Sequence, residues 1–358
     1  MVLRIVACLS ILVLAASTAS AAGFGGAETP AAPLRADGLA FAGHQDPVLA
    51  EFSKGGLFDE LLASNRSLSG ILDRVFTFEY NVPISGGRSL AVVESFSLRA
   101  WLRPRNRALL LLNGSAFNAE QWDAPDDAYS AHQFFGERGF FVFSVDYLGV
   151  DESTVPEDGF SVTYEVNREA MKELVRYIRF FRQVRKVDLF GEGFGGSMAS
   201  EIAADGSRIN SVSMGAMIYR EVQGGPLVDP LFVGLLAADD DGYFFSPGEG
   251  SLIFTTPETS PIFIQHIIDT QGGLYPVDNF LVATERPFFD PSVARAPGQV
   301  IYGGLDFIAV REDIEDLAAE YGRDGARLVV REDVGHAYIF ESPDTVTFYY
   351  QTVFDFIR

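Results

Sequence analysis

The strongest constraint on the fold is an alternation of short apolar runs with longer segments of helical spacing. Ala108–Leu112 contains only apolar residues, and Phe140–Val145 contains a single serine. Such runs are typical of parallel strands buried on both faces, because a half-exposed strand alternates apolar and polar residues. The expected strands are 108–112, 140–145, 187–190, 212–218, 300–302 and 328–330, and the expected helices are 163–181, 195–203 and 345–357. This order predicts an α/β fold, with a mostly parallel central sheet flanked by helices.

A different pairing is expected ahead of these strands. Phe76–Val82 and Leu90–Phe96 have strand-like composition, and the turn Ser85-Gly86-Gly87 lies between them. Glycines in a short connection between two such runs are typical of a β-hairpin. The sheet is therefore expected to begin with an antiparallel pair.

The first 21 residues have the layout of a secretory signal peptide. Arg4 precedes an apolar run from Ile5 to Ala16, and Ala19-Ser20-Ala21 supplies the small residues of a cleavage site. The run of about 12 residues is too short to span a bilayer comfortably, although an uncleaved anchor is the alternative. We expect export to the periplasm or outside the cell, a flexible arm and leading helices over 22–75, and no membrane span in the mature chain.

Charge and cysteine content exclude several classes of function. The 358 residues include 49 acidic and 27 basic side chains, which gives a net charge of −22. This acid excess disfavours binding to nucleic acid or to anionic membranes, where basic residues neutralise phosphates. The single cysteine, Cys8, lies in the predicted signal peptide, so neither an internal disulfide nor a cysteine-built zinc site is expected. No cofactor is predicted.

Between residues 221 and 297 the alternation of strands and helices breaks. Pro, Gly and Phe are frequent there, and we expect a lid inserted into a single domain that spans 76–358. The aromatic side chains of the insertion suit an apolar substrate pocket, and they suit the insertion's own core equally well. These residues are Phe244, Phe245, Phe254, Phe263, Phe288 and Phe289.

A glycine-rich turn joins the expected strand at 187–190 to the helix that follows. Its sequence is Gly191-Glu192-Gly193-Phe194-Gly195-Gly196. A strand, a tight glycine turn and a helix of small residues form the layout of a nucleophile elbow, whose pattern is G-x-nucleophile-x-G. Gly193 is at the nucleophile position, and glycine has no reactive side-chain atom. The sequence thus predicts the scaffold for a nucleophile without the nucleophile itself.

Four further motifs surround this turn in a fixed order: Leu110–Gly114, Asp146–Ser153, Tyr302–Asp306 and Val334–Ala337. With the elbow, they make the segment 76–358 resemble the α/β-hydrolase superfamily, in particular its lid-containing esterases and lipases. Two positions depart from the family pattern. Asn113 stands where histidine is commoner in the oxyanion loop, and Asp151 replaces the second glycine of the D-x-x-G-x-G-x-S loop.

The resemblance implies roles for individual residues. Asp306 would orient His336, which would act as general base and acid. The backbone N–H groups of Ser115 and Phe194 would form an oxyanion hole. Glu192 flanks the empty nucleophile position, where it either holds a water molecule or simply lines the cavity.

Two other residues are weaker candidates for the same chemistry. Ser197 follows Gly193 by four positions, about one helical turn, and is an alternative nucleophile. Glu221 follows the next strand and is an alternative acid, although Asp306 fits the family pattern better.

No metal site is predicted. His44, His132 and His266 lack the spacing of metal ligands and are expected at the surface or on helices. The acidic run Asp239–Asp241 suits calcium by charge, but the other spaced ligands of a calcium loop are missing, so a solvated loop is the better interpretation.

The glycines at 191, 193 and 196 also match G-x-G-x-x-G, the dinucleotide-binding fingerprint. Glu221 lies at the end of the next strand, where an acidic residue would bind ribose. The motif occurs mid-chain, however, and the contexts of Asp306 and His336 have no place in this interpretation. A dinucleotide-binding oxidoreductase is therefore the weakest hypothesis.

Three functions fit the sequence better. The first is an exported enzyme that acts on an ester or other small apolar substrate through a His336–Asp306 dyad, without a serine. The second is a non-catalytic relative that binds a ligand or partner. The third is an ordinary serine esterase in which Gly193 is a local replacement. Fold alone does not separate them.

Overall fold

The computed structural model describes residues 46–48, 72–102, 107–115, 117–206, 208–221, 223, 240–281, 287 and 289–358. Residues 72–358 form one compact unit, and residues 1–71 belong to another. The predicted signal peptide (1–21), His44 and nearly all of the predicted arm and leading helices (22–75) lie outside the described residues. Within the described residues, none of the helices has the length and apolar character needed to cross a membrane.

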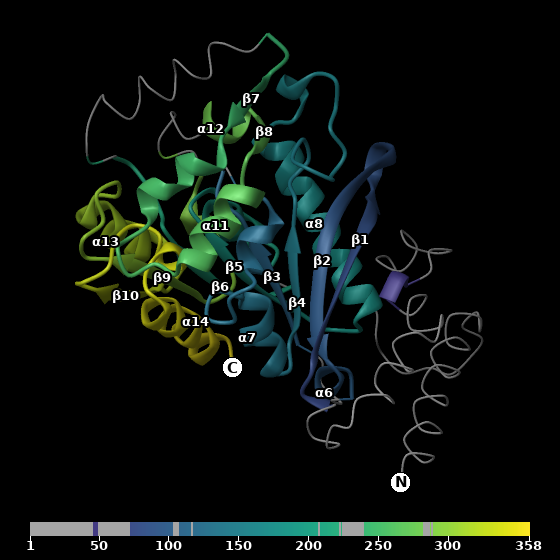
Figure 1. Cartoon of the computed structure of the whole chain (residues 1–358), viewed down its shortest axis with the longest axis horizontal. Helices are drawn as coiled ribbons and strands as arrows, with labels where there is room; N and C mark the ends of the chain where they lie inside the picture. The colour runs from purple at the N-terminus through teal and green to yellow at the C-terminus, as the bar shows by residue number, and fades with distance from the viewer. Residues whose placement is uncertain are drawn as a thin grey trace. The chain divides into compact units, whose positions relative to one another are not determined.

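The unit 72–358 is built on a sheet to which the described residues contribute eight strands: β1 (Val75–Ile84), β2 (Arg88–Ser97), β3 (Ala108–Leu112), β4 (Phe141–Val145), β5 (Val187–Glu192), β6 (Ile209–Gly215), β9 (Gly298–Gly303) and β10 (Arg327–Arg331). Their order across the sheet is β1-β2-β4-β3-β5-β6-β9-β10 (Figure 1). The β1–β2 and β2–β4 pairs are antiparallel, and all other neighbours are parallel. The predicted mostly parallel sheet with an initial hairpin is confirmed.

The apolar runs occupy the middle of this sheet. Every residue of β3 and β4 is buried, as expected for parallel strands covered on both faces. One predicted strand was misplaced: 212–218 is observed as β6 at 209–215. The strand ends early because Ala216 has a positive φ of 50°, which is incompatible with extended backbone.

Helices cover both faces of the sheet. The α-helices are α6 (Leu98–Trp101), α7 (Ala131–Glu137), α8 (Tyr164–Phe181), α9 (Phe194–Ile202), α11 (Pro261–Thr270), α12 (Asp278–Leu281), α13 (Arg311–Glu320) and α14 (Pro343–Ile357). Helices α7 and α14 pack together on one face, and α8 and α9 pack on the other (Figure 1). Short 3-10 helices occur at Ser85–Gly87 (η1), Ala119–Trp122 (η2), Gly159–Ser161 (η3), Gly248–Phe254 (η5), Pro291–Val293 (η7) and Tyr338–Phe340 (η8).

Local sequence sets where the two longest helices begin. The Thr163 side chain accepts a hydrogen bond from the Val166 amide at 3.3 Å and caps α8. Helix α14 begins with Pro343, which needs no hydrogen-bond partner in the first turn, after the N-cap Ser342. Both starts lie within two residues of the predicted boundaries.

The core on the α7–α14 face is rich in aromatic side chains. Phe190 of β5 packs against Trp122 with 5.0 Å between ring centroids, and against Tyr349 of α14 at 5.1 Å. Phe135 and Tyr350 complete this cluster and are fully buried. Aromatic packing therefore fixes α14 beneath the carboxyl end of β5.

The described part of the predicted insertion packs against segments that follow strand ends. Strands β7 (Tyr243–Ser246) and β8 (Gly273–Pro276) form an antiparallel pair, and Tyr243 and Pro276 lie close to Gly149, just after β4. In Figure 1 this pair lies with α12 beyond one end of the sheet strands.

The insertion's aromatic residues serve more than one purpose. Phe244, Phe263 and Phe289 are buried, whereas Phe245 is 63% exposed. Phe254 lies beside His336, and Phe288 is outside the described residues. The five described residues therefore have different surroundings: three belong to the core, one is exposed and one lies beside His336.

Candidate active site

Strand β5 ends in a tight turn at Gly193, from which α9 begins. Gly193 has φ 51° and ψ −115°, a conformation that residues with a side chain rarely adopt. Its N–H donates to the Gly215 carbonyl at 2.9 Å and fixes the turn against β6. Gly195 approaches β3 so closely that a Cβ would lie 2.3 Å from the Leu112 carbonyl oxygen. The turn therefore requires glycine on steric grounds at 195 and favours it on conformational grounds at 193.

Space remains beside Gly193. Among the described residues, the only atom within 4 Å of a Cβ placed there, other than its chain neighbours, is the Ala216 carbonyl oxygen, at 3.5 Å. That distance is an ordinary van der Waals contact. The position has space for the Cβ of a small side chain.

His336 and Asp306 form a buried hydrogen-bonded pair. His336 Nδ1 lies 2.7 Å from Asp306 Oδ2, and the two side chains are 7% and 1% exposed. The other carboxylate oxygen accepts hydrogen bonds from the amides of Ile308 and Ala309 at 2.7 and 2.9 Å. Because a carboxylate can only accept, Nδ1 carries the proton of the neutral ring and Nε2 presents a lone pair. This is the arrangement of an oriented base.

Aromatic side chains surround the His336 ring. Phe254 of the insertion lies 5.8 Å from it between centroids, and Phe254 in turn contacts Phe340 and Phe307 at 5.7 and 6.4 Å. Phe307 and Leu305, on either side of Asp306, are 51% and 65% exposed. The sequence analysis did not predict Phe307 and Phe340 as part of the candidate site, although they follow Asp306 and His336 by one and four residues. The dyad is thus bordered by apolar surface.

The candidate oxyanion donors follow two adjacent parallel strands. Ser115 comes shortly after β3 and Phe194 directly after the β5 turn, and the ends of these strands pair at Leu112 and Gly191. Phe194 is the first residue of α9, so its N–H has no acceptor within the helix. This N–H lies at the N-terminus of the helix, which is the positive end of the helix dipole. Asn113, which replaces the family's histidine, bonds to Val145 and Trp122 and therefore stabilises the loop.

Glu192 lies beneath the turn rather than at the surface. Its carboxyl adjoins the Tyr349 hydroxyl of α14, and its Oε1 atom has no hydrogen-bond partner among the described residues. Burial raises the pKa of Glu192 to about 7, and the Tyr349 hydroxyl partly offsets this rise. A role in holding water remains a prediction.

The weaker candidates have other partners. The Ser197 hydroxyl donates to the Gly193 carbonyl at 3.3 Å, within the first turn of α9. Glu221 is exposed, and its amide donates to Asp313 at 2.6 Å. The carboxylate that contacts His336 is therefore that of Asp306.

The other described histidines, His132 and His266, have hydrogen-bond partners of their own. His132 was expected at the surface or on a helix; it is on α7, but it is fully buried between two serines, Ser95 and Ser144, each at 2.9 Å. His266, on α11, is half-buried, and its Nε2 atom lies 2.9 Å from the Glu120 carbonyl oxygen. Among the described residues, which include Asp240 and Asp241 but not Asp239, no group of three or more His, Cys, Asp or Glu side chains is arranged to hold a metal ion.

A cavity of about 220 Å³ lies beside the β7–β8 pair, away from the dyad. Its lining includes neither His336 nor Gly193, and consists of Asn118, Gly149, Val150, Asp151, Val155, Gly272, Gly273, Leu274 and Tyr275.

Comparison with known proteins now decides the family. The sequence profile described as "Alpha/beta hydrolase family" matches residues 109–347, two thirds of the chain. This chain belongs to the alpha/beta hydrolase family. The match includes both Gly193 and the His336–Asp306 pair, and the sheet order above is that of a hydrolase-like fold rather than of the dinucleotide-binding fold, whose order is 3-2-1-4-5-6. No curated protein matches the chain.

Solved structures agree with this assignment. An enol-lactonase from Burkholderia xenovorans has a TM-score of 0.56 and 18% identity, with 78% of this chain and 99% of that chain covered. An esterase from Exiguobacterium antarcticum gives 0.57 and 16%, with 78% and 99% covered. A membrane phospholipase A, described as a bacterial virulence factor, gives 0.56 and 19%, with 87% and 97% covered. At these identities the likeness establishes the fold alone.

Proposed function

We propose that this alpha/beta hydrolase cleaves a carboxylic ester, or a similar small apolar substrate, with water activated by His336. The observation that carries the proposal is the 2.7 Å hydrogen bond from His336 Nδ1 to the buried Asp306 carboxylate, which leaves Nε2 as a base. The esterase and lactonase names among the structural relatives agree with this class of substrate.

The reaction needs no covalent intermediate. A water molecule in the space beside Gly193 gives a proton to His336 Nε2, and its oxygen forms a bond to the ester carbonyl carbon. The carbonyl oxygen becomes negative and accepts hydrogen bonds from the amides of Ser115 and Phe194. When the intermediate collapses, the bond to the alcohol oxygen breaks and the imidazolium returns the proton to it. The products are a carboxylic acid and an alcohol, and Asp306 stabilises the imidazolium throughout.

The surroundings of the dyad favour an apolar substrate. Phe254 lies next to His336 and contacts Phe307 and Phe340, and Phe307 and Leu305, the chain neighbours of Asp306, are exposed. An acyl chain or ring bound there would remove this surface from water at a gain of about 25 cal/mol per Å². A charged acyl group would lose its hydration without a compensating partner.

Ligand binding without catalysis is the second candidate, and the observation that favours it is Gly193 itself. Loss of the attacking hydroxyl normally removes most activity in this kind of site, and the residual rate comes from the oxyanion hole and binding. In this case the apolar surroundings of His336 would hold a small molecule without changing it.

Kinetics on p-nitrophenyl esters with short and medium acyl chains tests these functions. We expect slow turnover by the parent, loss of that turnover in His336→Ala, and no loss in His266→Ala, a matched control on α11. Gly193→Ser is expected to add a burst of product and labelling by a fluorophosphonate, which the parent lacks.

Other outcomes contradict the proposal. A silent parent with an active Gly193→Ser variant would mean an intact site that lacks only its nucleophile. Silence in both would favour the binding protein. Turnover that survives in His336→Ala would exclude the dyad as the source of activity.

We also propose that the chain is exported to the periplasm or the cell exterior. The support is the charged, apolar and small-residue order of residues 1–21. Fractionation of expressing bacteria, followed by N-terminal sequencing, is expected to give an extracytoplasmic protein that begins near Ala22. A cytoplasmic protein with an intact N-terminus would contradict the proposal.

A further inference from the structure

The turn that follows Asp306 determines how its carboxylate faces His336. The Oδ1 atom of Asp306 is bound by the amides of Ile308 and Ala309, and its Oδ2 atom is bound to His336. Ala309 is fully buried and Ile308 is 8% exposed. A shift of these two peptide groups would therefore rotate the carboxylate and move the histidine ring with it.

One residue from a distant part of the chain, Gln223, binds the opposite side of this turn. Its backbone N–H donates to the Ile308 carbonyl at 2.6 Å, and its side-chain Nε2 donates to the Ala309 carbonyl at 2.9 Å. Gln223 precedes Ala309 by 86 positions and lies at the start of the predicted insertion. The 308–309 peptide group is thus held between the Gln223 backbone on one side and Asp306 on the other, and the Gln223 side chain holds the next peptide group, 309–310.

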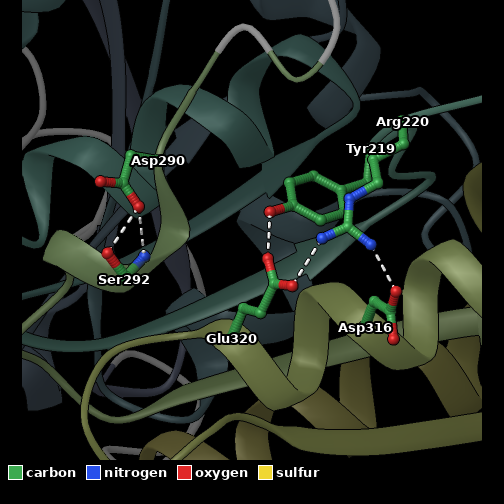
Figure 2. A network of polar contacts seen from close by, with 6 residues as sticks. All are labelled: Tyr219, Arg220, Asp290, Ser292, Asp316 and Glu320. Carbon is green, nitrogen blue, oxygen red and sulfur yellow. Dashed lines mark hydrogen bonds and ion pairs between the residues drawn. The ribbon is translucent and has the colours of Figure 1, made fainter.

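The segment just before Gln223 is fastened to α13, the helix that begins two residues after Ala309. Figure 2 shows the Tyr219 hydroxyl donating to Glu320, and the Arg220 guanidinium donating to both Asp316 and Glu320 of α13. The contacts are Tyr219–Glu320 at 2.5 Å, Arg220–Glu320 at 2.5 Å, Arg220–Asp316, and the Glu221 amide to Asp313 at 2.6 Å. These contacts therefore fix the position of residues 219–221, just before Gln223, relative to α13.

These contacts fix the position of residues 219–221 on α13, and they add little to the free energy of unfolding. Arg220 is 35% exposed and its partners Asp316 and Glu320 are 56% and 44% exposed, so solvent screens both ion pairs. Burial, with Glu320 beside it, raises the pKa of Tyr219 to about 12, so its hydroxyl remains a donor at neutral pH. Their combined effect is to restrict where the Gln223 amide can lie.

We propose that Gln223 is a positioning residue that aligns Asp306, and through it His336, by holding the 308–309 peptides. The inference rests on the function proposed above for the dyad. Reacting groups must be placed within a fraction of an ångström, and a 1 Å displacement costs on the order of 10²-fold in rate. Because Gln223 starts the insertion, it also links the position of the insertion to the alignment of the dyad.

A merely structural role for Gln223 predicts a different result. In that case its removal would lower the unfolding temperature and leave the His336–Asp306 hydrogen bond and the turnover of each folded molecule unchanged. The decisive readout is therefore the dyad itself, observed directly and independently of overall stability.

The experiment compares the parent with Gln223→Met and Gln223→Glu in the full chain. Met keeps the length of the side chain and the backbone bond to Ile308 but removes the donor to Ala309; Glu keeps the shape and replaces that donor with an acceptor. The His336 Nδ1–H proton, bonded to a carboxylate, gives a low-field NMR signal in the parent. We expect this signal to shift and exchange faster with water in both variants, with a roughly tenfold fall in kcat and little change in KM.

Gln351→Met is the matched control, since it makes the same exchange at a glutamine on α14 whose side chain donates to Asp355 at 3.1 Å rather than to the turn. It is expected to keep the low-field signal and to lose less than threefold in kcat. An unchanged signal and an unchanged kcat in both Gln223 variants would overturn the proposal. If the parent has no esterase activity, the proposed function fails, but the NMR signal still tests the hold of Gln223 on the dyad.

Discussion

Two buried carboxyl groups at the same end of the sheet have opposite surroundings. Asp306, after β9, binds His336 through one oxygen and two backbone amides through the other. Glu192, at the end of β5, has one oxygen with no hydrogen-bond partner among the described residues, and the Tyr349 hydroxyl lies near its carboxyl. Both residues are less than 10% exposed. Burial is therefore common to the two, and the partners differ.

The difference teaches what each carboxyl can contribute. The Asp306 carboxyl has hydrogen-bond partners for both of its oxygens, and the orientation of these oxygens directs the proton of His336. Glu192 is buried without such compensation, so its ionised form is costly and its pKa rises. A buried carboxylate is held in one orientation only where the fold supplies hydrogen-bond donors to its oxygens. Three substitutions, taken from the largest expected effect to the smallest, test this contrast.

Asp306→Asn is expected to reduce kcat on an ester by on the order of 10³–10⁴-fold. The 308 and 309 amides keep the asparagine oxygen on their side, so its NH2 group faces His336 and forces Nδ1 to accept a proton rather than donate one. Nε2 then carries the proton and cannot act as base. Steady-state kinetics near pH 8 measures this effect, and a variant that retains more than a tenth of the parent rate would contradict the assigned orientation.

Glu192→Gln is expected to stabilise the fold by about 3 kcal/mol more at pH 8 than at pH 4. Because burial raises the pKa of Glu192 from 4.5 to about 7, the unfolded chain ionises before the folded one. The resulting cost to stability is absent below pH 4.5, grows between pH 4.5 and 7 and is full above 7. Urea unfolding at both pH values measures the difference; an equal effect at both would show that the carboxyl is compensated.

Tyr349→Phe is expected to change the free energy of unfolding by less than about 1 kcal/mol at pH 5. Its hydroxyl has no well-formed hydrogen bond to lose. Tyr338→Phe is the matched control, since the Tyr338 hydroxyl donates to the Tyr302 carbonyl at 2.8 Å and its loss should cost about 1–3 kcal/mol. If the two variants lose the same stability, Tyr349 and Glu192 are better bonded than the contrast requires.

Much of the fold could be predicted because its signals are local. The apolar runs at 108–112 and 141–145 identify buried parallel strands, and the glycines at 193 and 195 identify a turn too tight for most side chains. The end of β6 could not be predicted, because Val212–Ile218 has no charged residue and a single serine, with no break in its pattern at 215, and the backbone of Ala216 ends the strand. The burial of His132 was missed because its two serine partners come from separate strands.

For the candidate site, the sequence by itself determined the residue types: a glycine at the elbow, and an acid and a histidine in familiar contexts. Tertiary structure decided which of them meet. Asp306 rather than Glu221 contacts His336, Phe254 reaches that ring from the insertion, and Gln223 holds the turn behind Asp306. The physical reason is range: strand and turn signals arise from neighbours in sequence, whereas hydrogen-bond partners 30 to 86 positions apart are chosen by how the sheet brings its strand ends together.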